Sequence, residues 1–401
     1  MLIGVVGKAN VGKSTFFKAA TLANVPIGNY PFVTIKPNHG MGYVRVECVD
    51  KEFGIKCNPR EGYCIKGQRF VSFEMLDVAG LVPGAHQGRG MGNQFLDDLR
   101  QADALIHVID CSGGTSEMGE PIEPGSYDPA NDIRFLEVEL DMWYLQILKK
   151  PWEKFAKQSY LEHVKVDKAI AKQFSGLNVD EAMVKEIIAK FNLDSENAMK
   201  WSEEQLKAFA VELRRRTKPM IIAANKVDVS AAKQNIERLR REFSDYIIVP
   251  CSAESELALK EASKHELISY IAGDSSFEIT NREKLSGKQI AALEFIKKNV
   301  IEQYGSTGVQ QVMNKAVFEL LGYIALFPVA MDKLQDQHGR YLPDCFLMPQ
   351  GTTALSFAYR LHSDFGDKFI RAVDVKSRLT IGKDHVLKHR DVIEIISGRK
   401  P

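Results

Sequence analysis

The fold is decided near the start of the chain by Gly7-Lys8-Ala9-Asn10-Val11-Gly12-Lys13-Ser14. This stretch matches the phosphate-binding pattern G-x-x-x-x-G-K-[ST], with a strand-like apolar run (2–6) before it and a helix-forming run (15–20) after it. In that order, backbone N–H groups and the helix N-terminus point at phosphate oxygens. We therefore predict a nucleotide site at Gly7, Lys8, Ala9, Asn10, Val11, Gly12, Lys13, Ser14 and Thr15, where Lys13 contacts the β- and γ-phosphates and the Ser14 hydroxyl ligates Mg²⁺.

Bulk composition sets the class of protein. The chain has 401 residues, of which 45% are hydrophobic and 26% charged, with a net charge of +1. These values predict a globular protein of two or three domains that has no general electrostatic attraction for nucleic acid. No stretch is long and apolar enough to span a membrane and the start shows no signal peptide, so we expect a cytoplasmic protein, and a monomer. The six cysteines are expected to be free thiols, and Cys57 and Cys64 lack the close spacing of a zinc knuckle.

Apolar β-branched runs alternate with helical patterns, as in a doubly wound, mostly parallel α/β sheet. This alternation stops after Asp110, and about ninety residues of helical periodicity follow before the next strand. We predict a nucleotide-binding domain at 1–112 and 218–275, a helical insertion at 113–217, a helical connector at 276–321 and a small α+β domain at 322–401. The expected strands after the first are 42–49, 70–76, 104–109, 220–224 and 246–249, and the expected helices are 131–148, 159–174, 179–191, 202–217 and 286–321.

Three later motifs follow strands of the predicted sheet. Asp77-Val78-Ala79-Gly80 supplies an acid that can hold a water on Mg²⁺ and a glycine whose N–H can approach a γ-phosphate. Asn225-Lys226-Val227-Asp228 is an N-K-x-D motif, and Cys251-Ser252-Ala253 follows the last strand. The Asp228 carboxylate can accept two hydrogen bonds from guanine N1–H and N2–H₂, whereas adenine would leave it unpaired. We therefore add Asn225, Lys226, Asp228, Ser252 and Ala253 to the site, with the Ala253 N–H on guanine O6.

Taken together, these motifs resemble those of the Obg family of GTPases, and more narrowly its YchF (Obg-like ATPase) subfamily in an archaeal-type form. The narrower resemblance rests on 30–38, which is similar to the family's switch I, and on 79–86 with 88–93, which is similar to its glycine-rich switch II. Residues 347–366 resemble a TGS domain, a β-grasp module, with 391–395 as its last strand. The resemblance implies a P-loop G domain, a C-terminal TGS domain and a role for Thr34, which would close over the γ-phosphate and ligate Mg²⁺.

Catalysis is expected to be slow. Leu81 stands where Ras-like GTPases place the glutamine that orients the attacking water, and leucine cannot hydrogen-bond to water. We assign catalytic roles to Lys13, Thr34, Gly80 and Asn10, and Mg²⁺ ligation to Ser14, Thr34 and Asp77. For Asn10 two roles remain open: the resemblance implies an asparagine that holds a K⁺ ion at the phosphates, while a loop asparagine can equally satisfy backbone groups. His86 is expected to be a solvated loop residue rather than a base.

The sequence thus predicts a GTP- and GDP-binding switch that hydrolyses GTP slowly. A ribosome or RNA contact through the TGS domain or the helical insertion is implied mainly by the resemblance, since 322–401 holds only 12 Lys and Arg against 9 Asp and Glu. Two alternatives stay open. One is an ATPase, because the resemblance extends to bacterial and eukaryotic YchF proteins, most of which lack a regular N-K-x-D and prefer ATP, although the intact motif here favours guanine. The other is a scaffold that binds nucleotide for stability without hydrolysing it.

Overall fold

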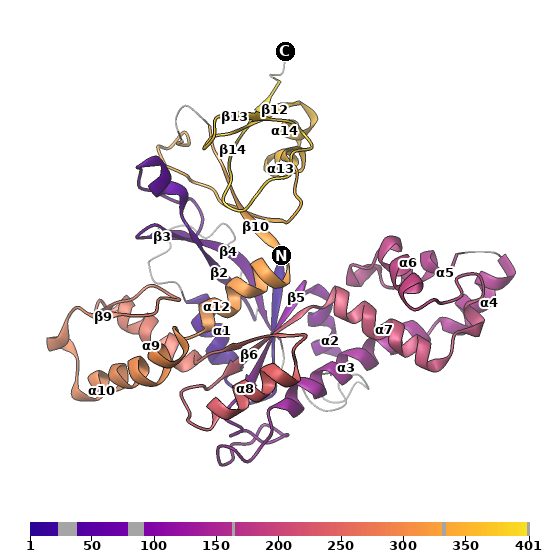
Figure 1. The fold of residues 1–401 in the computed structure, drawn as a ribbon, viewed down its shortest axis with the longest axis horizontal. Helices are drawn as coiled ribbons and strands as arrows, with labels where there is room; N and C mark the ends of the chain where they lie inside the picture. The colour runs from indigo at the N-terminus through magenta and orange to yellow at the C-terminus, as the bar shows by residue number, and fades with distance from the viewer. Residues whose placement is uncertain (23–37, 79–91, 163–164, 331–333, 399–401) are drawn as a thin grey trace. The chain divides into compact units, whose positions relative to one another are not determined.

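The computed structural model describes residues 1–22, 38–78, 92–162, 165–330 and 334–398 (Figure 1). The chain divides into two compact units. The first comprises Met1–Phe17 and Glu74–Ser255, and the second comprises Lys18–Phe73 and Glu256–Pro401. Within the described residues, every helix is too short or too polar to cross a membrane.

A parallel sheet forms the centre of the first unit, in the order β4-β1-β5-β6-β7. The strands are β4 (Gln68–Asp77), β1 (Leu2–Val6), β5 (Ala104–Asp110), β6 (Met220–Asn225) and β7 (Ile247–Pro250). Every residue of β1, β5 and β6 is buried, which explains why these strands read as continuous apolar runs rather than alternating ones. The register pairs Val5 with Asp77 and Asp110 with Asn225, so the motif-bearing strand ends share one edge of the sheet.

Helices flank this sheet. They are α1 (Lys13–Thr21), which begins in the first unit, α2 (Gly92–Gln101), α8 (Ala232–Glu242) and α9 (Ala253–Lys264), which begins at the end of that unit. Helix α1 starts directly after the glycine loop, and α9 starts directly after Ser252. The α/β, mostly parallel fold class expected from the sequence is confirmed.

Five helices lie between β5 and β6: α3 (Ala130–Lys149), α4 (Trp152–Glu162), α5 (Val166–Gln173), α6 (Glu181–Lys190) and α7 (Glu203–Thr217). Helices α3 and α7 lie side by side (Figure 1), joined by a buried 2.7 Å hydrogen bond between the Tyr144 and Thr217 hydroxyls and by Arg214 Nε on Asp141 Oδ1 at 2.8 Å. The expectation of one helix over 159–174 was wrong. Lys165 has an extended backbone, which starts α5 as a new helix after α4 ends at Glu162.

The second unit opens with β2 (His39–Glu47), a 3₁₀ turn η1 (Val49–Phe53) and β3 (Tyr63–Ile65), a strand that sequence patterns missed. β3 pairs antiparallel with the start of β4, where Tyr63 is opposite Phe70. The short strands β8 (Ile268–Ser269) and β9 (Glu278–Ile279) pair with each other. Strand β2 ends two residues before the expected Val49, because Val49 begins the 3₁₀ turn.

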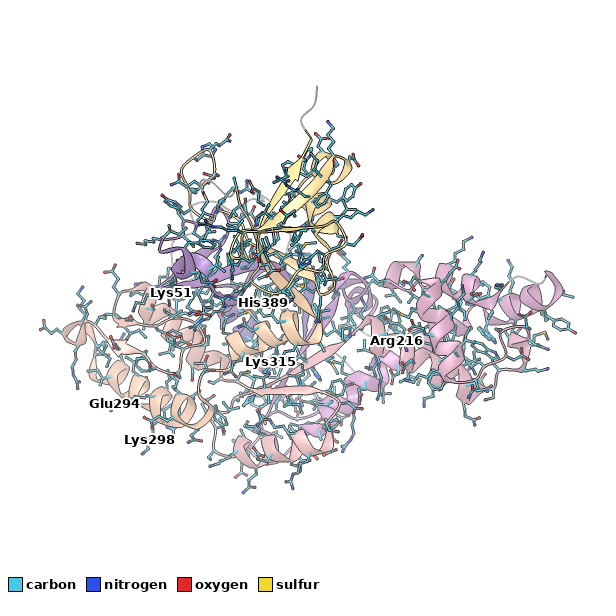
Figure 2. The ribbon with its side chains drawn as sticks, turned by 45° about the horizontal axis from the view of Figure 1, so that its top comes forward. Lys51, Arg216, Glu294, Lys298, Lys315 and His389 are labelled. Carbon is cyan, nitrogen blue, oxygen red and sulfur yellow. The ribbon has the colours of Figure 1, made fainter. Side chains whose placement is uncertain are left out.

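The expected helix over 286–321 is interrupted. Helix α10 (Gly287–Ile296) runs through a π-helical turn η6 (Lys297–Ile301) into α11 (Glu302–Tyr304), and α12 (Val309–Asn314) continues into a second π-helical turn η7 (Lys315–Leu320). Gly305 and Gly308 separate them with φ angles of 80° and 84°, which a helix cannot accommodate. Glu294 and Lys298 lie on the exposed face of α10 and η6 (Figure 2), opposite the buried Leu293 and Ile296.

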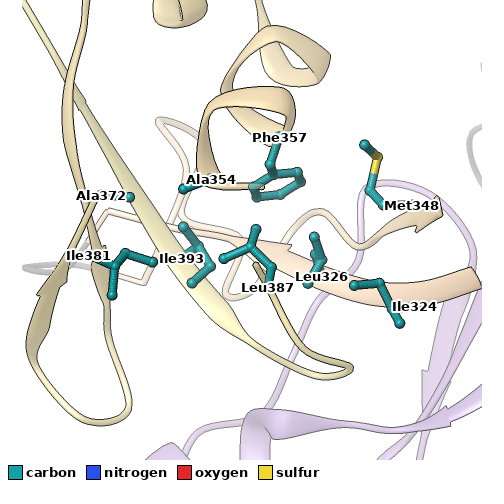
Figure 3. Packing of buried hydrophobic residues seen from close by; sticks show 9 residues of the cluster. All are labelled: Ile324, Leu326, Met348, Ala354, Phe357, Ala372, Ile381, Leu387 and Ile393. Atoms are coloured by element: carbon teal, nitrogen blue, oxygen red, sulfur yellow. The ribbon is translucent and has the colours of Figure 1, made fainter. Parts of the chain in front are cut away.

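The C-terminal domain has a five-stranded sheet in the order β11-β10-β14-β12-β13. Its elements are β10 (Tyr323–Pro328), β11 (Phe346–Pro349), α13 (Ala354–Leu361), α14 (Ser363–Asp367), β12 (Phe369–Asp374), β13 (Leu379–Ile381) and β14 (Val392–Ser397). Strands β10 and β14 are parallel, and the other pairs are antiparallel. Phe357 of α13 packs over the sheet (Figure 3) in a core completed by Ile324, Leu326, Met348, Ala354, Ala372, Ile381, Leu387 and Ile393. The domain thus has a hydrophobic core of its own.

Candidate functional site

The glycine loop connects β1 to α1 at the carboxyl edge of the first unit's sheet. Gly7 has a φ of 157°, and a Cβ there would lie 2.5 Å from the Val108 carbonyl oxygen. Gly12 has a φ of 91°, and a Cβ would collide with the Asn225 side-chain amide. Only glycine fits either position, because the loop packs directly against β5 and against the N-K-x-D motif. This packing leaves the start of α1 open as an anion-binding helix N-terminus.

Lys13 and Asp77 form an ion pair at the start of that helix. The pairing follows from the sheet register, since Val5 of β1 is opposite Asp77 of β4 and the loop then returns to Lys13. Ser14, the next residue, is exposed. A hydroxyl and a carboxylate oxygen beside a phosphate-binding loop are the hard oxygen ligands that Mg²⁺ prefers, so Ser14 and Asp77 fit this ion.

The side chains of Lys8 and Asn10 turn toward the segment that precedes α3. Lys8 is buried, and its Nζ donates to Asp132 Oδ1 at 2.8 Å and to the Thr115 carbonyl at 3.1 Å. The same ammonium lies 3.8 Å from the centre of the Tyr127 ring. Lys8 therefore anchors the glycine loop and leaves only its backbone for a phosphate.

Asn10 has a φ of 61°, and its side-chain amide donates to the Gly119 carbonyl at 2.8 Å. The sequence left two roles open for Asn10, and this contact fits the role in which the side chain hydrogen-bonds to a backbone group. A K⁺ ion at Asn10 has no support among the described residues.

Asp110, at the end of β5, is the centre of a network that sequence patterns did not identify. Its Oδ2 accepts from Lys226 Nζ at 2.8 Å and from the Thr115 hydroxyl at 2.5 Å, while its Oδ1 accepts from the Ser112 backbone and hydroxyl. Burial by itself raises the pKa of Asp110, but hydrogen bonds from Lys226, Ser112 and Thr115 outweigh burial and lower it below its ordinary value. Asp110 is therefore ionised and holds Lys226 in place.

Asn225 joins the glycine loop to the loop after β7. Its Nδ2 donates to the Val11 carbonyl at 2.9 Å, and its Oδ1 accepts from the Ala253 backbone N–H at 2.9 Å. The contact of that N–H with guanine O6 stays a prediction, and in the present structure the N–H donates to Asn225 Oδ1. Ser252 is buried, and its hydroxyl pairs with that of Ser255 at 2.8 Å at the start of α9. Asn225 and Ser252 therefore hold the loops around the site in place through hydrogen bonds within the protein.

A cavity of about 450 Å³ connects the two ends of this arrangement, and its lining comprises Lys8, Ala9, Asn10, Gly12, Lys13, Ser14, Thr15, Asn225, Lys226, Asp228 and Glu254. One end is the phosphate loop, and the other is the N-K-x-D motif. Asp228 is half-buried, and no described residue hydrogen-bonds to its carboxylate. The cavity thus presents an open carboxylate at one end and an ammonium with helix N–H groups at the other, which suits a purine nucleoside phosphate.

The structure brings together most of the predicted site: the glycine loop, Asp77, and residues from both later motifs. Thr34 and Gly80, expected to act in catalysis, lie outside the described residues, as do Leu81 and His86. Sequence reasoning missed Asp110, Asp132 and Glu254. Asp110 had a detectable signal, since it ends a buried strand at the same sheet edge as Asp77 and Asn225. Asp132 had no detectable sequence signal, because only the fold brings α3 to Lys8.

Three family models match separate parts of the chain. Residues 2–138 match the 50S ribosome-binding GTPase family. Residues 223–331 match the G4 motif-containing domain of the YGR210-like, Obg-like GTPases. Residues 338–397 match the TGS domain.

Several proteins are similar over the whole length. An uncharacterized GTP-binding protein of Methanocaldococcus jannaschii is 50% identical over 100% of both chains. A ribosome-binding ATPase, YchF, of Bacillus subtilis is 29% identical over 97% of both. The crystal structure of a GTP-binding protein from Pyrococcus horikoshii is 40% identical, with a TM-score of 0.79 over 99% of this chain and 100% of that one. The structure of the Schizosaccharomyces pombe YchF GTPase, 19% identical with a TM-score of 0.59 over 99% of this chain and 97% of that one, shows the same fold.

Proposed function

Because this chain belongs to the family of YchF and Obg-like GTPases, we propose that it binds GTP with Mg²⁺, hydrolyses it slowly and acts as a nucleotide-dependent switch. The observation that carries the proposal is the position of Asp228. Its open carboxylate lines the same cavity as Lys13 and Ser14, so one nucleotide can contact base-recognising and phosphate-binding groups together.

Guanine is the base that this carboxylate favours. Guanine offers N1–H and N2–H₂ as two parallel donors, and a carboxylate accepts both. Adenine has an acceptor at N1 and no amine at C2, so its binding would bury Asp228 without a partner. Lys226, fixed by Asp110 at 2.8 Å, gives the motif a defined position against the base.

Phosphate binding requires the Lys13–Asp77 ion pair to open. Lys13 would then contact the β- and γ-phosphates, and Asp77, released from Lys13, would hold Mg²⁺ together with the Ser14 hydroxyl, directly or through water. When bound, Mg²⁺ neutralises charge on the phosphate oxygens. Lys13 contributes a fixed positive charge where negative charge develops during transfer to water. Slow turnover is proposed because Leu81 stands where Ras-like GTPases place the glutamine that orients this water.

ATP hydrolysis is the second candidate. It is favoured by the name of the Bacillus subtilis relative, a ribosome-binding ATPase. Two observations oppose it here: the intact Asn225-Lys226-Val227-Asp228, and the open Asp228 carboxylate that adenine would leave unpaired.

A ribosomal partner is supported by the family that residues 2–138 match and by the names of the YchF relatives. On the C-terminal domain, Arg371 of β12 and Arg378, just before β13, are exposed, as are Ile370 and Leu379, their neighbours in the sequence. Cations next to exposed apolar side chains suit a surface that contacts RNA phosphate and bases. We propose this surface, named the β12–β13 surface, as the ribosomal contact.

Single-turnover hydrolysis with excess protein separates the three candidates. We expect GTP to be cleaved faster than ATP at matched, saturating protein, and Lys13→Ala to slow that cleavage by about a hundredfold or more. Faster cleavage of ATP would establish the ATPase. Binding of both nucleotides without cleavage of either would establish a nucleotide-stabilised scaffold.

A further inference from the structure

Three thiols and a carboxylate gather in the second unit, outside the nucleotide cavity. The sulfur atoms of Cys48, Cys57 and Cys64 and a carboxylate oxygen of Asp50 all lie within 4.8 Å of one another. Cys48 follows β2, Asp50 lies in η1, Cys57 is in the loop after η1, and Cys64 is in β3. Cys64 is half-buried, and the other three residues are buried. The fold thus brings together four ligand-type residues from four separate local structures.

Asp50 is incompletely satisfied in this cluster. Only 6% of the residue is exposed. Its Oδ2 accepts from the Cys57 backbone N–H at 3.4 Å and lies 4.0 Å from Cys64 Sγ, but its Oδ1 has no hydrogen-bond partner among the described residues. A buried carboxylate oxygen without a donor is unfavourable, and a cation among the neighbouring sulfur atoms would compensate it.

Arg69 provides a second, independent observation. It is 1% exposed, and its guanidinium donates to the carbonyls of Leu342 at 2.9 Å and Pro343 at 3.0 Å. The same group lies 3.5 Å from Cys57 Sγ, and within the described parts of the chain no carboxylate forms an ion pair with it. A donor of this kind on a ligating sulfur is typical of the outer shell of thiolate metal sites, where it stabilises the negative charge of the ligand.

We propose that Cys48, Asp50, Cys57 and Cys64 form a structural Zn²⁺ site. Thiolates are soft ligands that select Zn²⁺ over Mg²⁺ or Ca²⁺, and a carboxylate oxygen is an accepted fourth ligand. Tetrahedral zinc with Zn–S bonds of about 2.3 Å places ligand sulfurs about 3.8 Å apart, so the present cluster needs to contract by about 1 Å at most. Four protein ligands leave no open position for substrate, which makes the site structural rather than catalytic.

The metal would hold in place residues 48–66, a segment of the second unit with little regular secondary structure. Only η1 and the three residues of β3 give 48–66 regular structure. After Cys57 the chain pairs with the C-terminal half of the unit: the Asn58 N–H donates to the Tyr341 carbonyl and the Arg60 N–H to the Pro343 carbonyl, each at 2.9 Å. Arg60 also forms a 2.9 Å ion pair with Asp344. A metal at the cysteines would hold this pairing in place.

Metal analysis of the intact chain, purified without a chelating tag, tests the proposal. We expect one zinc per chain by mass spectrometry of the metal content. Replacement of zinc by Co²⁺ should give the thiolate-to-cobalt charge-transfer and visible bands of a tetrahedral site. Cys57→Ser should lose the metal, and Asp50→Asn should weaken its retention against a chelator at least tenfold. Cys345→Ala is the matched control, since Cys345 packs in the same hydrophobic cluster without belonging to the four ligands, and it should retain zinc.

Wild-type measurements decide the matter even where Cys57→Ser fails to fold. Absence of zinc together with no thiolate–cobalt absorption on a folded wild-type chain would overturn the proposal. So would intact-mass evidence for a disulfide among Cys48, Cys57 and Cys64. Retention of zinc by a folded Cys57→Ser chain would exclude these ligands in favour of another site.

Discussion

Lys226 Nζ lies 2.8 Å from Asp110 Oδ2, which joins the second residue of the N-K-x-D motif to the last residue of β5. The sheet register makes this contact possible, because Asp110 is paired with Asn225 across neighbouring strands. Asp110 is 2% exposed, and its hydrogen bonds keep it ionised. The base-recognition motif is therefore held by an acid that lies outside every nucleotide-binding motif of the sequence.

Asp110→Asn should destabilise the first unit and loosen Lys226. The neutral amide of asparagine would replace the charged carboxylate that accepts the hydrogen bond from the Lys226 ammonium. Loss of a hydrogen bond to a charged group lowers the free energy of unfolding by about 1.5–3 kcal/mol. Urea unfolding and GDP titration measure the two effects. Asp128→Asn is the control, because its ion pair with Arg238 at 2.5 Å is much more exposed than Asp110 and is worth about 1 kcal/mol or less. Equal effects of the two variants would contradict the role of Asp110.

His107 should make the protein sensitive to acid. It is buried in β5, its Nδ1 has no partner among the described residues, and burial, followed by the charge of Lys8, lowers its pKa to about 3. The unfolded imidazole has a pKa of about 6.5, so unfolding takes up a proton between those values. The contribution of neutral His107 to the free energy of unfolding is therefore fully present above about pH 6.5. As the pH falls below 6.5, this contribution decreases by about 1.4 kcal/mol per pH unit.

His107→Leu tests this linkage. Between pH 7 and pH 5 the wild type should lose roughly 2 kcal/mol more stability than the variant, measured as the difference in urea unfolding. If both lost the same amount, His107 would not be the neutral buried base that the structure indicates.

Lys13 and Ser14 should act differently on the nucleotide. Lys13→Ala removes a fixed charge from the phosphates, so both triphosphate affinity and hydrolysis should fall, the latter by about a hundredfold or more. Ser14→Ala should act through Mg²⁺, so part of the lost GTP affinity should return at high Mg²⁺. Titration of labelled GTP at two Mg²⁺ concentrations measures this contrast. Full turnover by Lys13→Ala would show that 7–14 is not the working phosphate site.

The positions of the main strands and of the phosphate loop were predictable because they depend on local signals. Runs such as 104–109 are apolar throughout, and each binding motif follows its strand directly. Breaks inside helical patterns were harder to predict: Lys165 begins a new helix through its own backbone conformation, and Gly305 and Gly308 end one through positive φ angles. Periodicity alone does not reveal either break.

Contacts between distant segments were not predictable. Lys8 pairs with Asp132 over 124 positions of sequence, and Asn225 Oδ1 accepts a hydrogen bond from the Ala253 backbone N–H. The cysteine cluster is a similar case. Cys57 and Cys64 lack the spacing of a zinc knuckle, and only the path of β2, η1 and β3 brings Cys48 and Asp50 to them.

Ribosome association should depend on nucleotide and on the β12–β13 surface. We expect stronger co-sedimentation with a non-hydrolysable GTP analogue than with GDP, and a decrease with added salt if the cations face RNA phosphate. Arg371→Glu with Arg378→Glu should reduce binding at least tenfold, because two attractive charges become repulsive. Lys298→Glu, on the exposed face that continues from α10, should have little effect. Unchanged sedimentation by the double variant would move the contact elsewhere, for example to the helical insertion.

The open carboxylate of Asp228 should make the site select guanine, and calorimetric titration of the wild type with GDP and ADP measures this selectivity. One bidentate base contact is worth about 1–3 kcal/mol, so GDP should bind at least tenfold more tightly than ADP. Asp228→Asn should remove that preference and favour a base with a carbonyl at C2, such as xanthine. Equal affinity of the wild-type chain for GDP and ADP would contradict the account.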